Sequence, residues 1–308
     1  MTAGRIALVS NSLPAPYVDT DLPFLVTGLT ASGFSPEIVI WNDASVDWAD
    51  FELVVIRSPW DYPSAPSEFL DWLARVEAVT PTLNAPDLIR WNIDKVYLRD
   101  LSEVSDVPLV PTEFCLTLDS VRAAIDAVNS NRVVIKPSIS AGSQNTGLFE
   151  RHDPAALTLA EEILELGKTV MVQPAIPSVQ EHGERALLYF DGQFSHAISK
   201  GPLLAVGGGL RGGAYVEEIA AVTPTPAERA VGDQLVAAVQ TVLLNRGLSA
   251  FDALPLYARV DVVNDPSTGP LVLEAELFEP SLFIHMNPDA VSRFVAAVLR
   301  RIEAIRAR

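Results

Sequence analysis

Short apolar runs alternate with amphipathic stretches over the first 90 residues. The pattern predicts strands at 5–9, 37–41, 53–57 and 81–84, and helices near 21–31 and 67–77. Strands that alternate with helices form parallel sheets, because each helix carries the chain back across the sheet. We therefore expect a parallel α/β unit over residues 1–90, with a boundary near Asn84-Ala85-Pro86.

The remaining chain is expected to form two further units, at 91–178 and 179–308. In the first, the pattern predicts a helix at 93–101, a strand at 132–136, a helix that begins after Asp153-Pro154, and a strand at 169–173. In the second it predicts strands at 186–190, 194–199 and 214–217, a long helix at 226–245 ended by Gly247, and a last helix capped by Asn287 with Pro288 at its first position. Asp191-Gly192 is a hairpin turn signal between two of these strands.

Two apolar strands near the C-terminus, 257–263 and 271–276, carry charges at alternate positions. A symmetric hairpin would set Val263 opposite Pro270 and Arg259 opposite Glu274. Because side chains alternate between the faces of a strand, one face gathers four charges, namely Arg259, Asp261, Glu274 and Glu276. Three carboxylates so close together favour a divalent cation among them. A solvated, charged face of an antiparallel sheet explains the pattern equally well at this point.

Composition limits the classes of partner. A net charge of −17 over 308 residues argues against nucleic acid, which needs a basic surface. The single cysteine, Cys115, excludes an intrachain disulfide and a multi-cysteine zinc site. No apolar run approaches the length of a membrane span. We expect a cytoplasmic protein without nucleic-acid or membrane partners, and a homodimer from base rates alone.

Two glycine-containing loops are candidates for phosphate binding. The spacing of Gly142 and Gly147 matches a P-loop, but Leu148 and Phe149 follow where that motif has Lys and Ser or Thr. A lysine ends the preceding buried strand instead, and small residues that let backbone N–H groups approach phosphate follow it: Lys136, Ser138, Ser140, Gly142 and Ser143. We favour a phosphate site here over a merely solvated lysine.

The second loop, Gly207-x-Gly209-x-x-Gly212, formally matches the dinucleotide fingerprint. Its context is wrong, because no strand runs directly into it and no helix directly out of it. A nicotinamide-dependent oxidoreductase therefore ranks last among the candidate functions. A loop that closes over substrate with Arg211 near its tip fits better, and a surface loop without function is the alternative.

Arg57 follows a strand of the N-terminal unit, at the edge of a parallel sheet where ligands bind. A guanidinium there suits a substrate carboxylate. A structural ion pair with Asp61 is the alternative.

Taken in order, these features resemble the ATP-grasp ligases over nearly the whole chain. The resemblance implies an α/β (α+β) fold in which an N-terminal parallel-sheet domain (1–90) precedes central (91–178) and C-terminal (179–308) domains that clamp ATP. Lys95 and Lys136 match the two lysines that reach the phosphates in that family. The other implied nucleotide contacts are Gln173, the backbone of Ala175 and Ile176 for adenine, Glu181 or Glu184 for ribose, and Arg185 near the phosphates.

The same resemblance implies a site for Mg²⁺, with Mn²⁺ as the alternative, held by Asp261, Glu274 and Glu276. Glu276 departs from the family's Glu-x-Asn pattern, which has Asn at this position. Arg259 would stabilise the transferred phosphate, Lys200 would bind the reacting carboxylate, and Arg211 would close down with its loop.

Two stretches, Arg57-Ser-Pro-Trp-Asp-Tyr62 and Leu273-Glu-Ala-Glu-Leu-Phe-Glu-Pro-Ser281, are most similar to the cyclo-ligases that close O-ureido-D-serine to D-cycloserine. This implies an amino-acid-like small molecule as the substrate, with contacts from Arg57, Asp61, Tyr62, Glu279 and Ser281. The implied reaction activates a carboxylate as an acyl phosphate, which a nitrogen of the same molecule attacks. An intermolecular ligase of the same fold and a nucleotide-binding protein without turnover are the alternatives.

Overall fold

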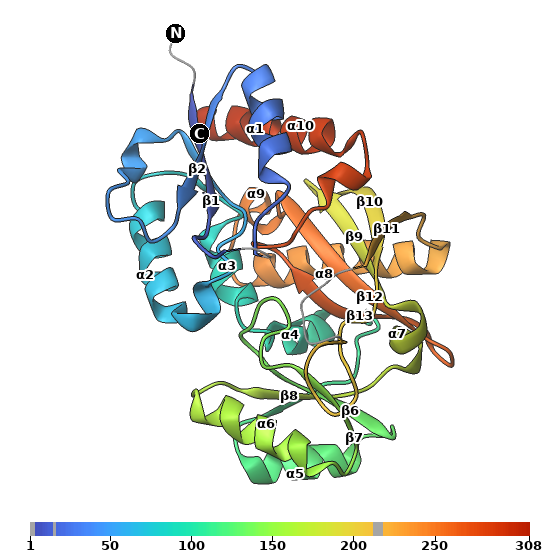
Figure 1. The fold of residues 1–308 in the computed structure, drawn as a ribbon. Coiled ribbons are helices and arrows are strands. Elements are labelled where there is room, and N and C mark those ends of the chain that lie inside the picture. Colours follow the sequence, from blue (N-terminus) through green and yellow to red (C-terminus); the bar gives the residue numbers. More distant parts are fainter. Residues whose placement is uncertain (1–3, 15–16, 212–217) are drawn as a thin grey trace.

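The computed structural model describes residues 4–14, 17–211 and 218–308. Three sheets organise the chain (Figure 1). One belongs to the blue N-terminal part, one to the green part at the bottom of the view, and one to the yellow and orange C-terminal part beside them. Within the described ranges, no helix has both the length and the apolar character needed to cross a membrane.

The first sheet has the order β2-β1-β3-β4 and is entirely parallel, as predicted. Its strands are β1 (Arg5–Ser10), β2 (Ser35–Ile40), β3 (Leu53–Ile56) and β4 (Thr82–Leu83), with short turns η1 (Trp48–Asp50) and η2 (Tyr62–Ser64). Alternate β1 side chains enter two different apolar clusters, one with α1 (Leu22–Ala31) and the other with α2 (Pro66–Glu77). The helices therefore cover opposite faces of the sheet.

The helix predicted at 93–101 is wrong in its bounds. The chain forms α3 (Pro86–Asn92) and α4 (Tyr97–Val104), with Lys95 in the break between them. Asp94 accepts a hydrogen bond from the Val96 N–H at 3.1 Å, a local turn contact just before α4 begins. The Lys95 N–H donates to the Ser138 carbonyl at 2.9 Å, which attaches this break to the second sheet.

The second sheet is antiparallel, with the order β5-β8-β6-β7. Its strands are β5 (Glu113–Cys115), β6 (Arg132–Pro137), β7 (Gly147–Glu150) and β8 (Val170–Pro174), and the adjoining helices are α5 (Leu118–Ala127), α6 (Pro154–Glu165) and α7 (Pro177–His182). Side chains of α5 and α6 share one apolar cluster with the sheet. The predicted strands and α6 are confirmed near their expected positions, whereas the sequence analysis did not predict β5, α5, β7 and α7.

The third sheet has the order β11-β10-β9-β12-β13. It contains β9 (Glu184–Phe190), β10 (Gln193–Lys200), β11 (Ile219–Val222), β12 (Tyr257–Asp265) and β13 (Gly269–Glu276), followed by η4 (Ile284–Met286). Helix α8 (Pro226–Asn245) packs on one face and α10 (Ala290–Arg306) on the other, with α9 (Ala250–Ala253) between them in sequence. Helix α10 also contacts α1, so the third sheet and the first share a core (Figure 1).

Local chemistry explains why α8 matches its predicted bounds. Thr225 and Glu228 form a capping box at its start, and Gly247 follows its end with φ of 92°. The Asp191-Gly192 hairpin turn is also confirmed, with both residues at positive φ. The last helix was predicted two residues too early, since Asp289 rather than Asn287 is its N-cap. The strand predicted at 214–217 lies outside the described residues.

The predicted register of the β12–β13 hairpin is wrong. Arg259 pairs with Glu276, and Val263 pairs with Leu271 instead of Pro270. An irregularity between Asp261 and Val262 shifts the register. It changes the pairing of the residues beyond it, which a regular hairpin does not allow for.

Candidate active site

Four charged side chains lie on one face of the β12–β13 hairpin, as predicted. Arg259 is opposite Glu276, and Asp261 is opposite Glu274. Oxygen atoms of Asp261, Glu274 and Glu276 lie within 4.8 Å of one another. The other face of the strands packs against α8, so only the charged face can meet a ligand.

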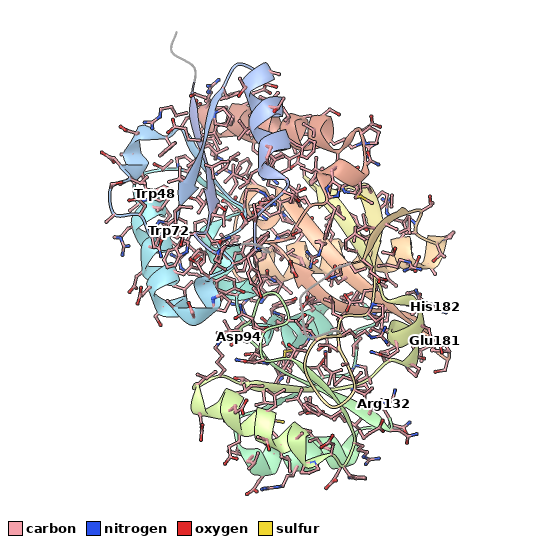
Figure 2. The ribbon with its side chains drawn as sticks, viewed as in Figure 1. Trp48, Trp72, Asp94, Arg132, Glu181 and His182 are labelled. Atoms are coloured by element: carbon pink, nitrogen blue, oxygen red, sulfur yellow. The ribbon has the colours of Figure 1, made fainter. Side chains whose placement is uncertain are left out.

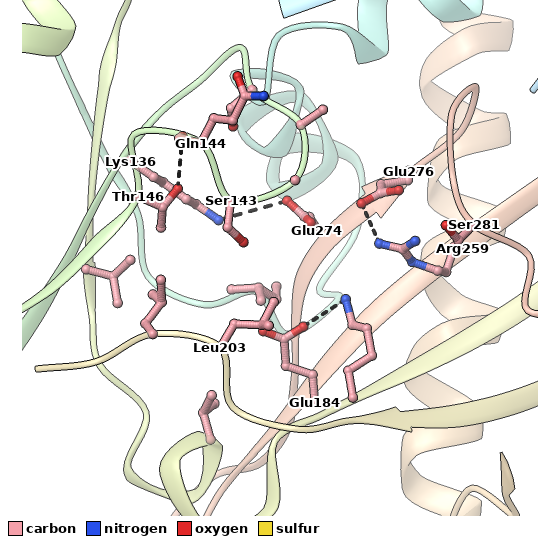
Figure 3. Close-up of a pocket in the computed structure, with 18 of the residues that line it drawn as sticks. Lys136, Ser143, Gln144, Thr146, Glu184, Leu203, Arg259, Glu274, Glu276 and Ser281 are labelled. Carbon is pink, nitrogen blue, oxygen red and sulfur yellow. Dashed lines mark hydrogen bonds and ion pairs between the residues drawn. The ribbon is translucent and has the colours of Figure 1, made fainter. Parts of the chain in front are cut away.

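Four cationic side chains from three parts of the chain converge on these acids, and Figure 3 labels two of them, Lys136 and Arg259. Arg259 donates two hydrogen bonds of 2.9 Å to Asp261 and also pairs with Glu276. Lys200 Nζ lies 2.7 Å from Asp261 and 3.0 Å from Glu184. The amino groups of Lys95 and Lys136 lie 3.8 and 3.9 Å from Glu274 Oε2. The cluster therefore brings together a lysine between two helices, a lysine of the second sheet and an acid of the third.

Burial and charge move the pKa values of these groups in different directions. Burial by itself raises the pKa of Asp261, but Arg259 and Lys200 outweigh it, and the pKa falls to about 2. Burial raises the pKa of Glu276 to about 8, against the opposing effect of Arg259. Burial also lowers the pKa of Lys136. A divalent cation would favour the ionised form of Glu276. The site offers carboxylate oxygens, which are the kind of ligand that Mg²⁺ prefers.

A cavity of about 420 Å³ opens beside the cluster. Its wall combines the glycine loop after β6, the end of β8, the first residues of β9 and the charged face of the hairpin. Most of the predicted site residues line it, namely Lys95, Lys136, Ser140, Gly142, Ser143, Gln173, Ala175, Ile176, Glu184, Lys200, Arg259, Glu274, Glu276, Glu279 and Ser281. Asp261 is fully buried beneath Arg259 and Lys200.

Comparisons with known proteins agree with this geometry. Residues 6–84 match the family model of the N-terminal domain of D-cycloserine synthetase DcsG. The cycloserine biosynthesis protein DcsG of Streptomyces lavendulae is 33% identical over 307 residues, which cover 97% of this chain and 99% of the relative. The chain belongs to the DcsG family of ATP-grasp ligases.

Solved structures extend the comparison. The crystal structure of D-cycloserine synthetase DcsG superposes with a TM-score of 0.87 at 34% identity, covering 97% of this chain and 100% of the other. D-alanine–D-alanine ligase of Bacillus anthracis shares the fold, with a TM-score of 0.64 at 14% identity over 99% of both chains. The predicted ATP-grasp fold is thus confirmed. The three sheets of this DcsG-family ligase fall within the segments 1–90, 91–178 and 179–308, whose limits stay predictions.

The two backbone N–H groups predicted to bind adenine differ in whether a carbonyl of the protein already accepts a hydrogen bond from them. The Ala175 N–H already donates to the Arg132 carbonyl at 3.0 Å. Among the described residues, no hydrogen bond engages the N–H of Ile176, which follows at the N-terminus of α7. Gln173 donates to Thr112 Oγ1 at 2.8 Å, which fixes its side chain at the cavity wall.

Three of the predicted nucleotide contacts do not line the cavity, which corrects the sequence interpretation. Ser138 is buried, and its backbone bonds Lys95 and Thr169. Arg185 follows Glu184 on β9, so its side chain takes the opposite face and lies 3.8 Å from Glu228 of α8. Glu181 is exposed on α7 beside His182 (Figure 2), and it does not line the cavity. Of the two candidate ribose acids, only Glu184 lines the cavity.

Two arginines with predicted roles at the substrate, Arg57 and Arg211, do not line the cavity either. Arg57 is fully buried, 3.6 and 3.9 Å from Asp19 and Asp21, and donates to the Pro280 carbonyl at 2.9 Å. Its contacts are therefore with the protein interior, and it does not line the cavity. Arg211 is exposed and does not itself line the cavity, although it donates at 2.7 Å to Gln180, which does.

Asp61 and Tyr62 do not line the cavity either. Asp61 accepts a hydrogen bond from Trp41 at 2.6 Å, so the ion pair with Arg57 considered above is wrong as well. Tyr62 is buried and donates to Glu279 Oε1 at 2.9 Å.

The loop at 207–210 faces the loop at 142–146 across a second hollow, which is more open than the cavity. Residues of both loops line this hollow. The N–H groups of Gly207 and Gly208 donate to the Leu148 carbonyl at 2.9 and 3.1 Å. The last glycine of the dinucleotide fingerprint, Gly212, lies outside the described residues.

Several cavity residues were missed by the sequence analysis: Tyr17, Thr20, Trp60, Gln144, Thr146, Phe283 and His285. Trp60, Gln144 and Thr146 belong to stretches that had been singled out, so their neighbours gave a signal. Tyr17 lies outside the helices and strands and His285 lies in the short η4, and neither stretch has a recognisable pattern.

Proposed function

We propose that this chain is an ATP- and Mg²⁺-dependent cyclo-ligase that converts O-ureido-D-serine to D-cycloserine. The observation that carries the proposal is the convergence of Lys95 and Lys136 on Glu274, at the wall of a cavity that also receives Arg259. This is the arrangement of charges that phosphoryl transfer needs. The identity of 33% to DcsG over nearly the whole of both chains supports the choice of substrate.

The proposed reaction begins with attack of the substrate carboxylate on the γ-phosphate of ATP. The acyl phosphate that forms is attacked by the ureido nitrogen bound to oxygen, which makes the ring C–N bond, releases phosphate and loses a proton. Water then attacks the carbamoyl carbon, and its bond to the ring nitrogen breaks. The ring nitrogen takes up a proton, and the carbamic acid that leaves decomposes to carbon dioxide and ammonia. Ring closure needs mainly orientation, because the nucleophile and the acyl group belong to one molecule.

The protein residues supply orientation and charge. Lys95 and Lys136 would hold the phosphates, and Arg259 would stabilise the phosphoryl group in transfer. Lys200, 2.7 Å from Asp261, would bind the reacting carboxylate. Glu184 would accept hydrogen bonds from the ribose, and the Ile176 N–H would bind the adenine edge.

Asp261, Glu274 and Glu276 would hold Mg²⁺, since their oxygens already lie within 4.8 Å of one another. When bound, the cation offsets negative charge on the phosphates. Mn²⁺ would suit the same oxygen donors. We place the reaction in the cytoplasm, where ATP is available, and the homodimer stays a prediction.

ADP release tests the proposal directly. The protein with Mg²⁺ and ATP is given O-ureido-D-serine as the sole organic substrate, and the organic product is identified by mass. ADP together with D-cycloserine supports the cyclo-ligase. Turnover that begins only after an amine or a second amino acid is added indicates an intermolecular ligase. Nucleotide binding without ADP under any of these conditions indicates a protein without turnover.

A further inference from the structure

Glu279 differs from every other carboxylate that lines the cavity. Glu184, Glu274 and Glu276 each have a lysine or arginine partner within 4.0 Å. Within residues 4–14, 17–211 and 218–308, Glu279 has none. In the described part of the chain, the lysines and arginines of the site therefore pair with other acids, and Glu279 has no cation within 4.0 Å.

The two carboxylate oxygens of Glu279 are in unlike situations. Oε1 accepts a hydrogen bond of 2.9 Å from the Tyr62 hydroxyl. Oε2 is buried and accepts no hydrogen bond from the described part of the chain. Only 7% of the residue is exposed. A largely buried carboxylate without a cationic partner is unfavourable, so Glu279 at the cavity wall is suited to a ligand that brings an N–H group with positive charge.

Rigid contacts hold Glu279 in place. The Tyr62 ring is packed between Phe69 and Phe278, with ring centroids 5.5 and 5.2 Å away. The Trp60 indole N–H donates to the Glu279 carbonyl at 2.8 Å. Both contacts come from the stretch 57–62, which the sequence analysis singled out for the substrate itself. In the structure, this stretch therefore fixes both the backbone and the side chain of Glu279.

We propose that Glu279, which lines the cavity, binds the α-ammonium group of the amino-acid substrate, with Tyr62 and Trp60 as positioning residues. The assignment rests on the proposed function, because it takes O-ureido-D-serine as the substrate. The carboxylate end of that molecule then faces the cationic cluster, and its ammonium end meets Glu279, which has no cationic partner among the described residues. Burial raises the pKa of Glu279 to about 7, and a bound ammonium group would favour its ionised form.

The test compares two ligands that differ only in the ammonium group: O-ureido-D-serine and its deamino analogue, 3-(ureidooxy)propanoate. Their dissociation constants are measured by calorimetry on protein saturated with Mg²⁺ and a non-hydrolysable ATP analogue. Glu279→Gln keeps the shape and removes the charge. We expect it to weaken binding of O-ureido-D-serine at least tenfold and to leave binding of the deamino analogue within about twofold.

Two further variants sharpen the experiment. Tyr62→Phe removes only the hydroxyl that orients Glu279, and it should weaken O-ureido-D-serine selectively but by a smaller factor than Glu279→Gln. It decides the question if Glu279→Gln fails to fold, as judged by circular dichroism. Glu184→Gln, on the proposed nucleotide side, is the matched control and should affect both ligands equally.

Equal weakening of both ligands by Glu279→Gln and by Tyr62→Phe would overturn the assignment and leave the proposed function standing. An absence of ADP release from the wild-type protein with O-ureido-D-serine would overturn the proposed function first, and this inference with it. Selective loss of the ammonium-bearing ligand supports both.

Discussion

Removal of the Tyr97 hydroxyl should weaken the strand that carries the metal-site acids. Tyr97 is buried on α4, and its hydroxyl donates to the Ala275 carbonyl at 2.9 Å and accepts from the Ala275 N–H at 2.7 Å. Ala275 lies between Glu274 and Glu276 on β13, the edge strand of its sheet. The tyrosine therefore occupies the place that a neighbouring strand would otherwise take.

The structure sets the size of the expected loss. In Tyr97→Phe the Ala275 carbonyl keeps a hydrogen bond of 3.0 Å from Asn92, so only the N–H loses its partner. One orphaned, buried donor costs about 1–3 kcal/mol. Tyr189→Phe is the matched control. Its hydroxyl donates at 2.9 Å to Asp233, which stays half-exposed and keeps Arg229 at 2.7 Å, so about 0.5–1 kcal/mol is expected.

Urea unfolding followed by circular dichroism compares the two variants with the wild type. Tyr97→Phe should shift the midpoint to lower urea by more than Tyr189→Phe, with little change in slope. The Mg²⁺ concentration that gives half-maximal ADP release should also rise in Tyr97→Phe only, because the two acids beside Ala275 lose their support. Equal midpoint shifts and an unchanged Mg²⁺ requirement would refute the reasoning.

Three further predictions concern single side chains. Lys136→Met should lower kcat/KM for ATP about 10²- to 10³-fold, as loss of one preorganised donor to a charged group does, and a loss below about threefold in the ADP-release assay would contradict its proposed role. Glu184→Gln should raise the KM for ATP, whereas Glu181→Gln on the exposed side of α7 should leave it unchanged; equal effects would show that the cavity wall is assigned wrongly. Burial raises the pKa of the Cys115 thiol, so a thiol-reactive dye should label native protein slowly at neutral pH, faster as the pH rises, and rapidly in urea; fast labelling of native protein would show that the thiol is accessible.

Sequence reasoning succeeded where local chemistry decides the structure. The capping box at Thr225 and the glycine at 247 define α8 without help from distant residues. Because side chains alternate along a strand, Arg259 and Asp261 were correctly predicted to share one face. The wrong register did not change this, since Arg259 pairs two residues further along β13 than predicted, and a slip by two residues preserves the face.

The same reasoning failed where distant partners decide. Arg57 has the residue type and strand-end position of a ligand contact, but Asp19, Asp21 and the Pro280 carbonyl engage it in the interior. No local pattern announces those partners, because they come from a loop and from a segment more than 200 residues away. Glu181 and Glu184 were indistinguishable for a related reason, as only the path of α7 into β9 exposes one and turns the other inward.

The contacts along the outer edge of β13 bear on how the protein can be divided. Asn84 donates to the Leu277 carbonyl, Asn92 accepts from the Leu277 N–H, and the Pro108 carbonyl accepts from the Val272 N–H. Residues 84–110 thus close a strand that begins 159 positions after they end. A fragment that starts at residue 179 would expose this edge to pairing with other chains. We expect such a fragment to aggregate, and a chain cut between 178 and 179 to regain its fold only when both pieces are refolded together.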